Sequence, residues 1–126
     1  MKALVYQSLR FAAVGLINTA IGLAAIYGFM YFLRVGPAAA NAMGYAIGFF
    51  SSFLLNRAWT FSSNRKITHV LPRYFFIAAI SYLLNLGVVT AGAAFLQLNL
   101  YIVQLLGVSI YTLCMFLGCR WFVFSK

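Results

Sequence analysis

Long apolar stretches alternate with short polar breaks along the whole chain of 126 residues. A helix needs about 20 mainly apolar residues to cross the roughly 30 Å of hydrocarbon in a bilayer. Four stretches reach or nearly reach that length, at residues 11–33, 38–55, 74–96 and 100–118. The pattern therefore predicts an all-α membrane protein with four transmembrane helices, forming a single transmembrane domain over residues 1–126.

Three polar breaks separate the predicted spans. The first, at residues 34–37, contains the helix breaker Gly36-Pro37, and the last, at residues 97–99, is short enough for a tight turn. The central break, at residues 56–73, is long, polar and basic, and it contains His69. We expect it to be a loop that joins two helical hairpins.

The basic residues predict the orientation, because cytoplasmic loops carry an excess of Lys and Arg. Eight of the nine fall on one side of the predicted spans, and only Arg34 falls on the other. The eight are Lys2, Arg10, Arg57, Arg65, Lys66, Arg73, Arg120 and Lys126. We therefore expect a multi-pass protein of the cytoplasmic (inner) membrane with both termini in the cytoplasm, an N-in/C-in topology.

The two predicted hairpins resemble each other at an offset of 63 residues. Arg10 then aligns with Arg73 and Arg57 with Arg120, which carries weight in a chain with so few charged residues. A two-helix repeat returns to its starting side, so the halves, about 10–63 and 73–126, are expected to be parallel repeats. Duplication is the favoured explanation, and convergence on a shared positive-inside, aromatic-belt pattern is the alternative.

Composition excludes several classes of protein. Hydrophobic residues make up 65% of the chain and charged residues 7%, against about 25% in soluble domains. The net charge of +9 does not indicate nucleic acid, since the basic residues lie between apolar blocks. With no Asp or Glu and one His, we expect no metal, no cofactor and no enzymatic activity. For Cys114 and Cys119, packing as small residues is the favoured role.

Polar residues inside the predicted spans need partners or a function, because the bilayer core holds no water. Asn18 lies about 12 Å inside the first span at about 1.5 Å per residue, and Asn85 lies near the middle of the third. Ser52 lies one turn from the inner edge of the second. Two interpretations stay open: hydrogen bonds between helices worth about 1 kcal/mol each, or a path along which these side chains hydrogen-bond a polar head group.

Small residues at four-residue spacing form two ridges. One runs through Ala40, Gly44, Gly48 and Ser52, and the other through Ala20, Ala24 and Gly28. Such ridges let helix backbones approach closely, within one bundle or between subunits. Four helices bury little without partners, so we expect a homo-oligomer or a partner subunit.

Arginine stands beside aromatic residues at the predicted cytoplasmic ends of the second and fourth spans. Aromatic anchoring at the interface explains this, and so does binding of a lipid phosphate by Arg57 and Arg120, whose guanidinium groups hold two oxygens at once. The candidate residues for the lipid phosphate and head group are Arg57, Arg120, Asn56, Trp59, Arg10 and Arg73.

The segments RFAAVGLINTAIG, FLLNRAWTF and RWFVF resemble the GtrA-like family of four-span membrane proteins, over residues 10–124. This resemblance implies a role in cell-surface polysaccharide synthesis: flipping of polyprenyl-phosphate-linked sugars, such as undecaprenyl-phosphate glucose, often beside a membrane glycosyltransferase. With that role, Asn18, Asn85 and Ser52 are the candidates for the path of the sugar. The residues that match the family's motif are Asn18, Asn56, Arg57, Trp59 and Phe61, with Arg120 and Phe124 in a weaker second copy. Cys119 replaces Asn56 in that copy, which puts the equivalence of the two halves in doubt.

Two other functions compete with this one. Small four-span multidrug exporters depend on a membrane-embedded glutamate, and the chain has none. An accessory subunit that anchors a glycosyltransferase without transport is compatible with everything in the sequence. The chain shows no nucleotide site or relay residue, so the hypothesis is passive flipping, driven by consumption of the lipid-linked sugar outside.

Overall fold

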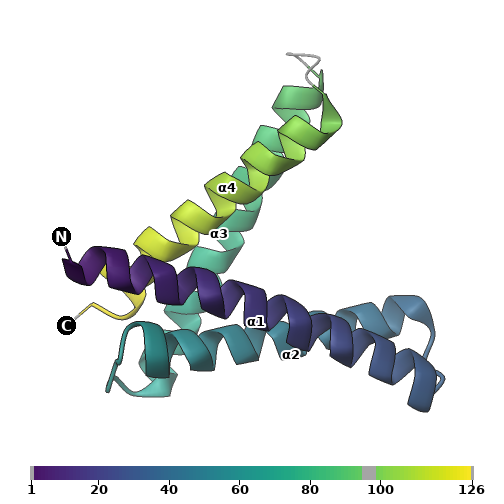
Figure 1. The fold of residues 1–126 in the computed structure, drawn as a ribbon, viewed down its shortest axis with the longest axis horizontal. Coiled ribbons are helices and arrows are strands. Elements are labelled where there is room, and N and C mark those ends of the chain that lie inside the picture. Colours follow the sequence, from purple (N-terminus) through teal and green to yellow (C-terminus); the bar gives the residue numbers. More distant parts are fainter. Residues whose placement is uncertain (1, 95–98, 126) are drawn as a thin grey trace. The chain divides into compact units, whose positions relative to one another are not determined.

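The computed structural model describes residues 2–94 and 99–125 (Figure 1). Four α-helices and two short π-helices follow one another as α1 (Lys2–Phe32), α2 (Pro37–Leu55), η1 (Asn56–Thr60), α3 (Ile67–Ala94), α4 (Leu100–Gly118) and η2 (Cys119–Val123). They form two compact units, Met1–Ser63 and Asn64–Lys126. In the first unit α2 packs against α1, and in the second α4 packs against α3, so each unit is a helical hairpin.

The helices are apolar on every side, and most of their large side chains face outward. Leu16 is 76% exposed and Tyr101 is 86% exposed. Four helices are long and apolar enough to cross a membrane. The 31 residues of α1 extend about 46 Å, more than the roughly 30 Å of hydrocarbon. These properties confirm an all-α, multi-pass membrane protein, while the side on which the termini lie stays a prediction.

The prediction of a loop over residues 56–73 is wrong at both ends. Residues 56–60 continue the second span as η1, and α3 already begins at Ile67, so His69 and Arg73 lie in a helix. Lys66 O accepts hydrogen bonds from the His69 and Val70 amides, which closes the first turn of α3. Pro72 is tolerated close to this end at the cost of one amide donor. Similarly, α1 begins at Lys2, before the predicted span. The predicted turn at 97–99 and the end of the third span at 96 lie outside the described residues, apart from Asn99.

The first ridge of small residues lies inside the first hairpin. Ala40, Gly44 and Gly48 are all buried, and a Cβ added to Gly44 would lie 3.1 Å from the Gly22 carbonyl oxygen of α1. The helices therefore approach closely enough that Gly44 has no room for a side chain. In the second ridge Ala20 and Ala24 are exposed, so that ridge is not covered by α2.

The second hairpin meets the same packing demand with large and small residues exchanged. Gly92 of α3 lies against Val103 of α4, which is buried. The positions 63 residues earlier hold a large residue, Phe29, on α1 and a buried small one, Ala40, on α2. At this level the second hairpin thus has its small residue on the first helix, whereas the first hairpin has its small residue on the second helix.

Candidate head-group site at the open ends of the hairpins

Each hairpin has an open end, where its two chain ends lie, and both open ends contain a π-helix. The Phe61 amide donates to Asn56 O at 2.9 Å, and the Phe124 amide donates to Cys119 O at 2.9 Å. Both bonds span five residues and so widen the last turn of the second and fourth spans. Single π turns inside membrane or soluble helices are rare and often mark functional sites. The two π-helices, η1 and η2, are related by the same offset of 63 residues. We therefore take the open end of each hairpin as a candidate functional site.

In each hairpin an arginine of the first helix donates a hydrogen bond to a backbone carbonyl of the π-helix. The Arg10 guanidinium donates to Trp59 O at 2.7 Å and to the Tyr6 hydroxyl at 2.6 Å, and lies 4.1 Å from the Tyr6 ring centroid. The Arg73 guanidinium donates to Phe122 O at 3.3 Å. The last carbonyls of a helix have no amide partner within it, and these arginines supply one. Arg10 and Arg73 thus serve the fold; their predicted contact with a head group stays a prediction.

A pair of aromatic rings lies at the open end of each hairpin. The ring centroids of Phe11 and Phe61 are 6.4 Å apart, and those of Tyr74 and Phe124 are 6.3 Å apart. These pairs are also related by 63 residues. The agreement of π-helix, arginine bond and ring pair supports an origin by duplication.

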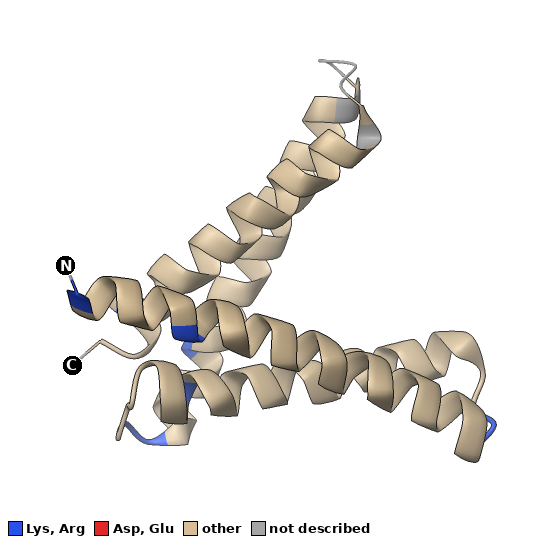
Figure 2. Ribbon diagram, in the orientation of Figure 1, with Lys and Arg blue, Asp and Glu red and all other residues tan. Residues whose placement is uncertain are grey.

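The remaining predicted cations, Arg57 and Arg120, lie on the π-helices themselves and are half-buried. Figure 2 shows the basic residues of each hairpin near its open end, apart from Arg34 at the closed end of the first. Trp59, on the same π-helix as Arg57, is 40% exposed. The geometry thus gives each hairpin one arginine on a widened turn at the open end.

A line of polar side chains runs inward from the open end of the first hairpin. Asn56 is 2% exposed and donates through Nδ2 to Ser52 Oγ at 3.3 Å, and Thr60 is 3% exposed. Asn18 on α1 faces Gly48, whose missing Cβ would lie 3.5 Å from Asn18 Oδ1. We call Asn18, Ser52, Asn56 and Thr60 the polar seam. Because Gly48, Ser52, Asn56 and Thr60 are spaced by four, the seam follows one side of α2 and η1.

Three oxygens of the polar seam lack hydrogen-bond partners. Asn18 Oδ1, Asn56 Oδ1 and Thr60 Oγ1 are buried, and no residue in the described ranges bonds to them. Leaving a buried polar atom unpaired costs about 1–3 kcal/mol. The seam is therefore a costly feature of an otherwise apolar hairpin.

Asn85, the other asparagine assigned to the sugar path, lies on α3 in the second hairpin. Its Oδ1 would be 2.7 Å from a Cβ on Gly107, so it packs against that glycine inside the second hairpin. The position that matches it in the first hairpin is Gly22, not Asn18. Asn18 and Asn85 are thus not repeat equivalents, and each belongs to its own hairpin.

Thr60 was not among the residues predicted from the sequence. Its signal is the four-residue spacing that follows Ser52 and Asn56, but the sequence places it in the connection, where a polar residue is unremarkable. Only the continuation of the helix through η1 brings it into line with the other two.

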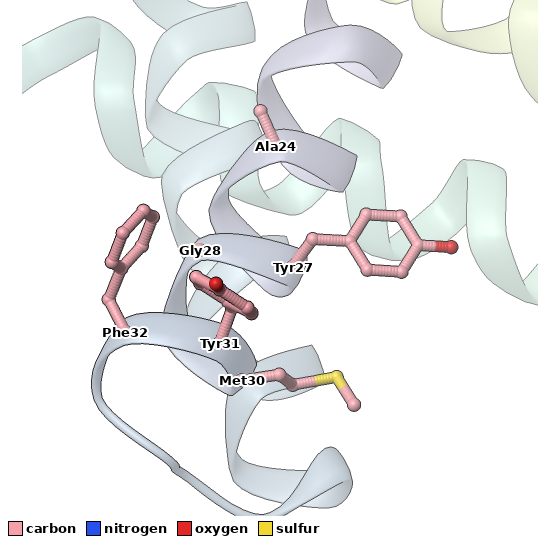
Figure 3. Close-up of a pocket in the computed structure, with 6 residues that line it drawn as sticks. All are labelled: Ala24, Tyr27, Gly28, Met30, Tyr31 and Phe32. Atoms are coloured by element: carbon pink, nitrogen blue, oxygen red, sulfur yellow. The ribbon is translucent and has the colours of Figure 1, made fainter.

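A shallow depression lies on the outer surface of α1, near the closed end of the first hairpin (Figure 3). Its lining residues all belong to that helix: Ala24, Tyr27, Gly28, Met30, Tyr31 and Phe32. In Figure 3 the hydroxyl ends of Tyr27 and Tyr31 point away from the helix axis, as in an aromatic belt at a membrane interface. The depression contains no charged residue and shares none with the predicted site.

A comparison with protein-family models assigns the chain to a family. The family model described as GtrA/DPMS, transmembrane domain, matches residues 10–124. Searches of curated proteins and of solved structures returned no match for the chain. Because the match covers nearly the whole chain, the protein belongs to the GtrA/DPMS transmembrane-domain family, which fits a membrane protein of polysaccharide synthesis.

Proposed function

We propose that the protein flips polyprenyl-phosphate-linked sugars across the cytoplasmic membrane for cell-surface polysaccharide synthesis or modification. Its family, whose members are generally non-catalytic membrane proteins, supports this role. The observation that carries the proposal is the first open end, where Arg57 stands directly beside the buried, incompletely paired Asn56.

The chemistry of such a lipid matches that end. Its phosphate diester carries one negative charge, and its sugar carries several hydroxyl groups. Moving the charge through hydrocarbon without compensation is prohibitively costly. Arg57 and Arg120 supply cations on the widened turns, and guanidinium binds phosphate oxygens in pairs. The chain has no Asp or Glu to repel the phosphate.

Transport in this proposal is passive. The sequence holds no carboxylate for a proton relay, so the direction of flipping follows the lipid gradient, maintained by consumption of the lipid-linked sugar on the outer side. Arg57 and Arg120 meet the lipid at the cytoplasmic leaflet, in keeping with the predicted orientation.

The test is leaflet exchange of a fluorescent polyprenyl-phosphate glucose in liposomes that contain the pure protein, scored with a membrane-impermeant quencher. Wild type should accelerate exchange over empty liposomes. Arg57→Gln should slow it about ten-fold, the loss expected for a charge-assisted hydrogen bond of at least about 1.4 kcal/mol. The matched control is Lys66→Gln, which removes the same charge from the exposed connection between the hairpins.

Two results would count against the proposal. If wild type moved the lipid no faster than empty liposomes but co-purified with a membrane glycosyltransferase, an accessory subunit would be the better description. If the Arg57 variant, folded and inserted, matched wild type, Arg57 would have no part in transport.

A further inference from the structure

The two hairpins provide an internal comparison, because they share a backbone plan but differ in the polar seam. At the positions of Ser52, Asn56 and Thr60 the second hairpin has Met115, Cys119 and Val123, all buried. At the position of Asn18 it has Ser81, whose hydroxyl donates to Ile77 O at 2.7 Å. The second hairpin is therefore apolar or internally bonded at each position where the first has a residue of the polar seam.

This comparison shows that the fold does not require the polar seam. With Cys119 and Val123 the second hairpin still forms its π-helix, its arginine-to-carbonyl bond and its aromatic pair. Nor does Asn56 join the two helices, since the bond it donates goes to Ser52 on its own helix. Three unpaired oxygens confined to one half thus point to a ligand that completes them.

The unpaired atoms define the chemistry of that ligand. An asparagine Oδ1 only accepts hydrogen bonds, and a phosphate diester has no hydrogen to donate. Hydroxyl groups donate and accept, so they can pair with Asn18 Oδ1, Asn56 Oδ1 and Thr60 Oγ1 alike. The seam therefore suits a polyol, while the neighbouring Arg57 suits a phosphate.

The seam also ends inside the hairpin. Beyond Gly48 toward the closed end, the Ile26 side chain fills the space where a Gly44 side chain would stand. From Gly48 to Thr60 is 12 residues, about 18 Å along a helix and more than half of the hydrocarbon thickness. The buried polar groups thus reach from the open end to the middle of the hairpin and stop there, as expected for groups that bind a head group approaching from the open end.

We infer that the two halves of the protein have different roles: the first hairpin alone binds the sugar of the lipid, through hydroxyl contacts to Asn56 and Thr60, and the second is its structural counterpart. This inference rests on the proposed function and adds a specificity to it. The sugar-bearing lipid should bind more tightly than the same polyprenyl phosphate without a sugar, and the difference should come from the first hairpin.

The experiment transfers the residues of one hairpin to the other. Asn56→Cys/Thr60→Val gives the first hairpin the residues that the second already tolerates, and Cys119→Asn/Val123→Thr is the reciprocal control. Binding of polyprenyl-phosphate glucose and of polyprenyl phosphate is measured in nanodiscs. We expect the first variant to lose at least about ten-fold affinity for the glucose lipid, and to bind the sugar-free lipid as wild type does.

Thermal unfolding of the same variants provides a second measurement that needs no ligand. Removal of unpaired buried polar atoms should leave Asn56→Cys/Thr60→Val at least as stable as wild type, whereas the reciprocal variant, which buries new polar groups, should be less stable. If the polar seam were purely structural, Asn56→Cys/Thr60→Val would be less stable than wild type. That result would overturn the inference.

The outcomes separate this inference from the proposed function. If wild type bound neither lipid, the proposed function would fail, and the inference with it. Equal wild-type affinity for both lipids, or an equal loss for both in the variant, would overturn the sugar site alone. An equal loss of glucose-lipid binding in the reciprocal variant would show that the halves do not differ in role.

Discussion

The close approach of α1 and α2 at Gly44 makes a prediction that depends on no assumption about function. A Cβ at Gly44 would collide with the Ile26 side chain and lie 3.1 Å from Gly22 O, a backbone atom that cannot move aside by rotation. At Gly15, on α1 of the same hairpin, a Cβ would meet nothing within 4 Å. The same substitution to alanine should therefore have opposite effects at these positions.

The magnitudes follow from two opposing contributions. Alanine favours a helix over glycine by about 1 kcal/mol, which is the whole effect expected for Gly15→Ala. Overpacking of a close contact costs about 1–3 kcal/mol, so Gly44→Ala should lose about 1 kcal/mol after that gain is subtracted. The two variants should thus differ by about 2 kcal/mol in the free energy of unfolding.

Unfolding in mixed micelles, followed by circular dichroism, measures this difference. A double-mutant cycle sharpens the test, because Ile26→Ala removes the atoms that collide with the new Cβ. In that background Gly44→Ala should cost much less than in wild type, a coupling of about 1 kcal/mol or more. Gly44→Ala that stabilised the protein as Gly15→Ala does, or additive effects in the cycle, would show that the helices do not approach closely here.

The other predictions concern the open ends and the orientation. Arg10→Met should cost about 2 kcal/mol of unfolding free energy and Arg73→Met about 1 kcal/mol, since Arg10 makes two short hydrogen bonds and the bond from Arg73 to Phe122 O is longer. The same micelle titration checks this, and equal effects would contradict it. For the orientation, a C-terminal fluorescent-protein fusion should fluoresce in the cytoplasm, and Gly36→Cys in the exposed connection of the first hairpin should react with an impermeant maleimide from outside. Labelling of Gly36→Cys only after lysis would reverse the predicted topology.

Much of the fold could be predicted because it depends on short-range properties of the chain. Apolar length predicts a helix in a bilayer, and Gly36-Pro37 predicts the break before α2, where the structure has Pro37 in the first turn. The offset that aligns Arg10 with Arg73 is the same offset that relates their bonds to Trp59 O and Phe122 O. The few charged residues were informative about the alignment of the two halves, because few positions in a membrane protein can accommodate a charge.

The partners of those charges could not be predicted. The sequence predicts that Arg10 contacts a lipid head group, and it gives no sign that the guanidinium donates to a backbone carbonyl 49 residues away, a contact that requires the tertiary structure. The first π-helix, η1, was missed for a related reason. Residues 56–60 read as polar, and polarity suggests a loop, whereas the helix continues because the wider turn still pairs Phe61 with Asn56.

The two hairpins differ in the cost of their buried polar groups. Each unpaired atom of Asn18, Asn56 and Thr60 destabilises the hairpin that contains it. The second hairpin retains the same open end with Cys119 and Val123 in its interior, free of that cost. In the inferred division of roles, the first hairpin keeps the polar groups that would bind the sugar, and the second keeps the same kind of open end without the cost of burying them.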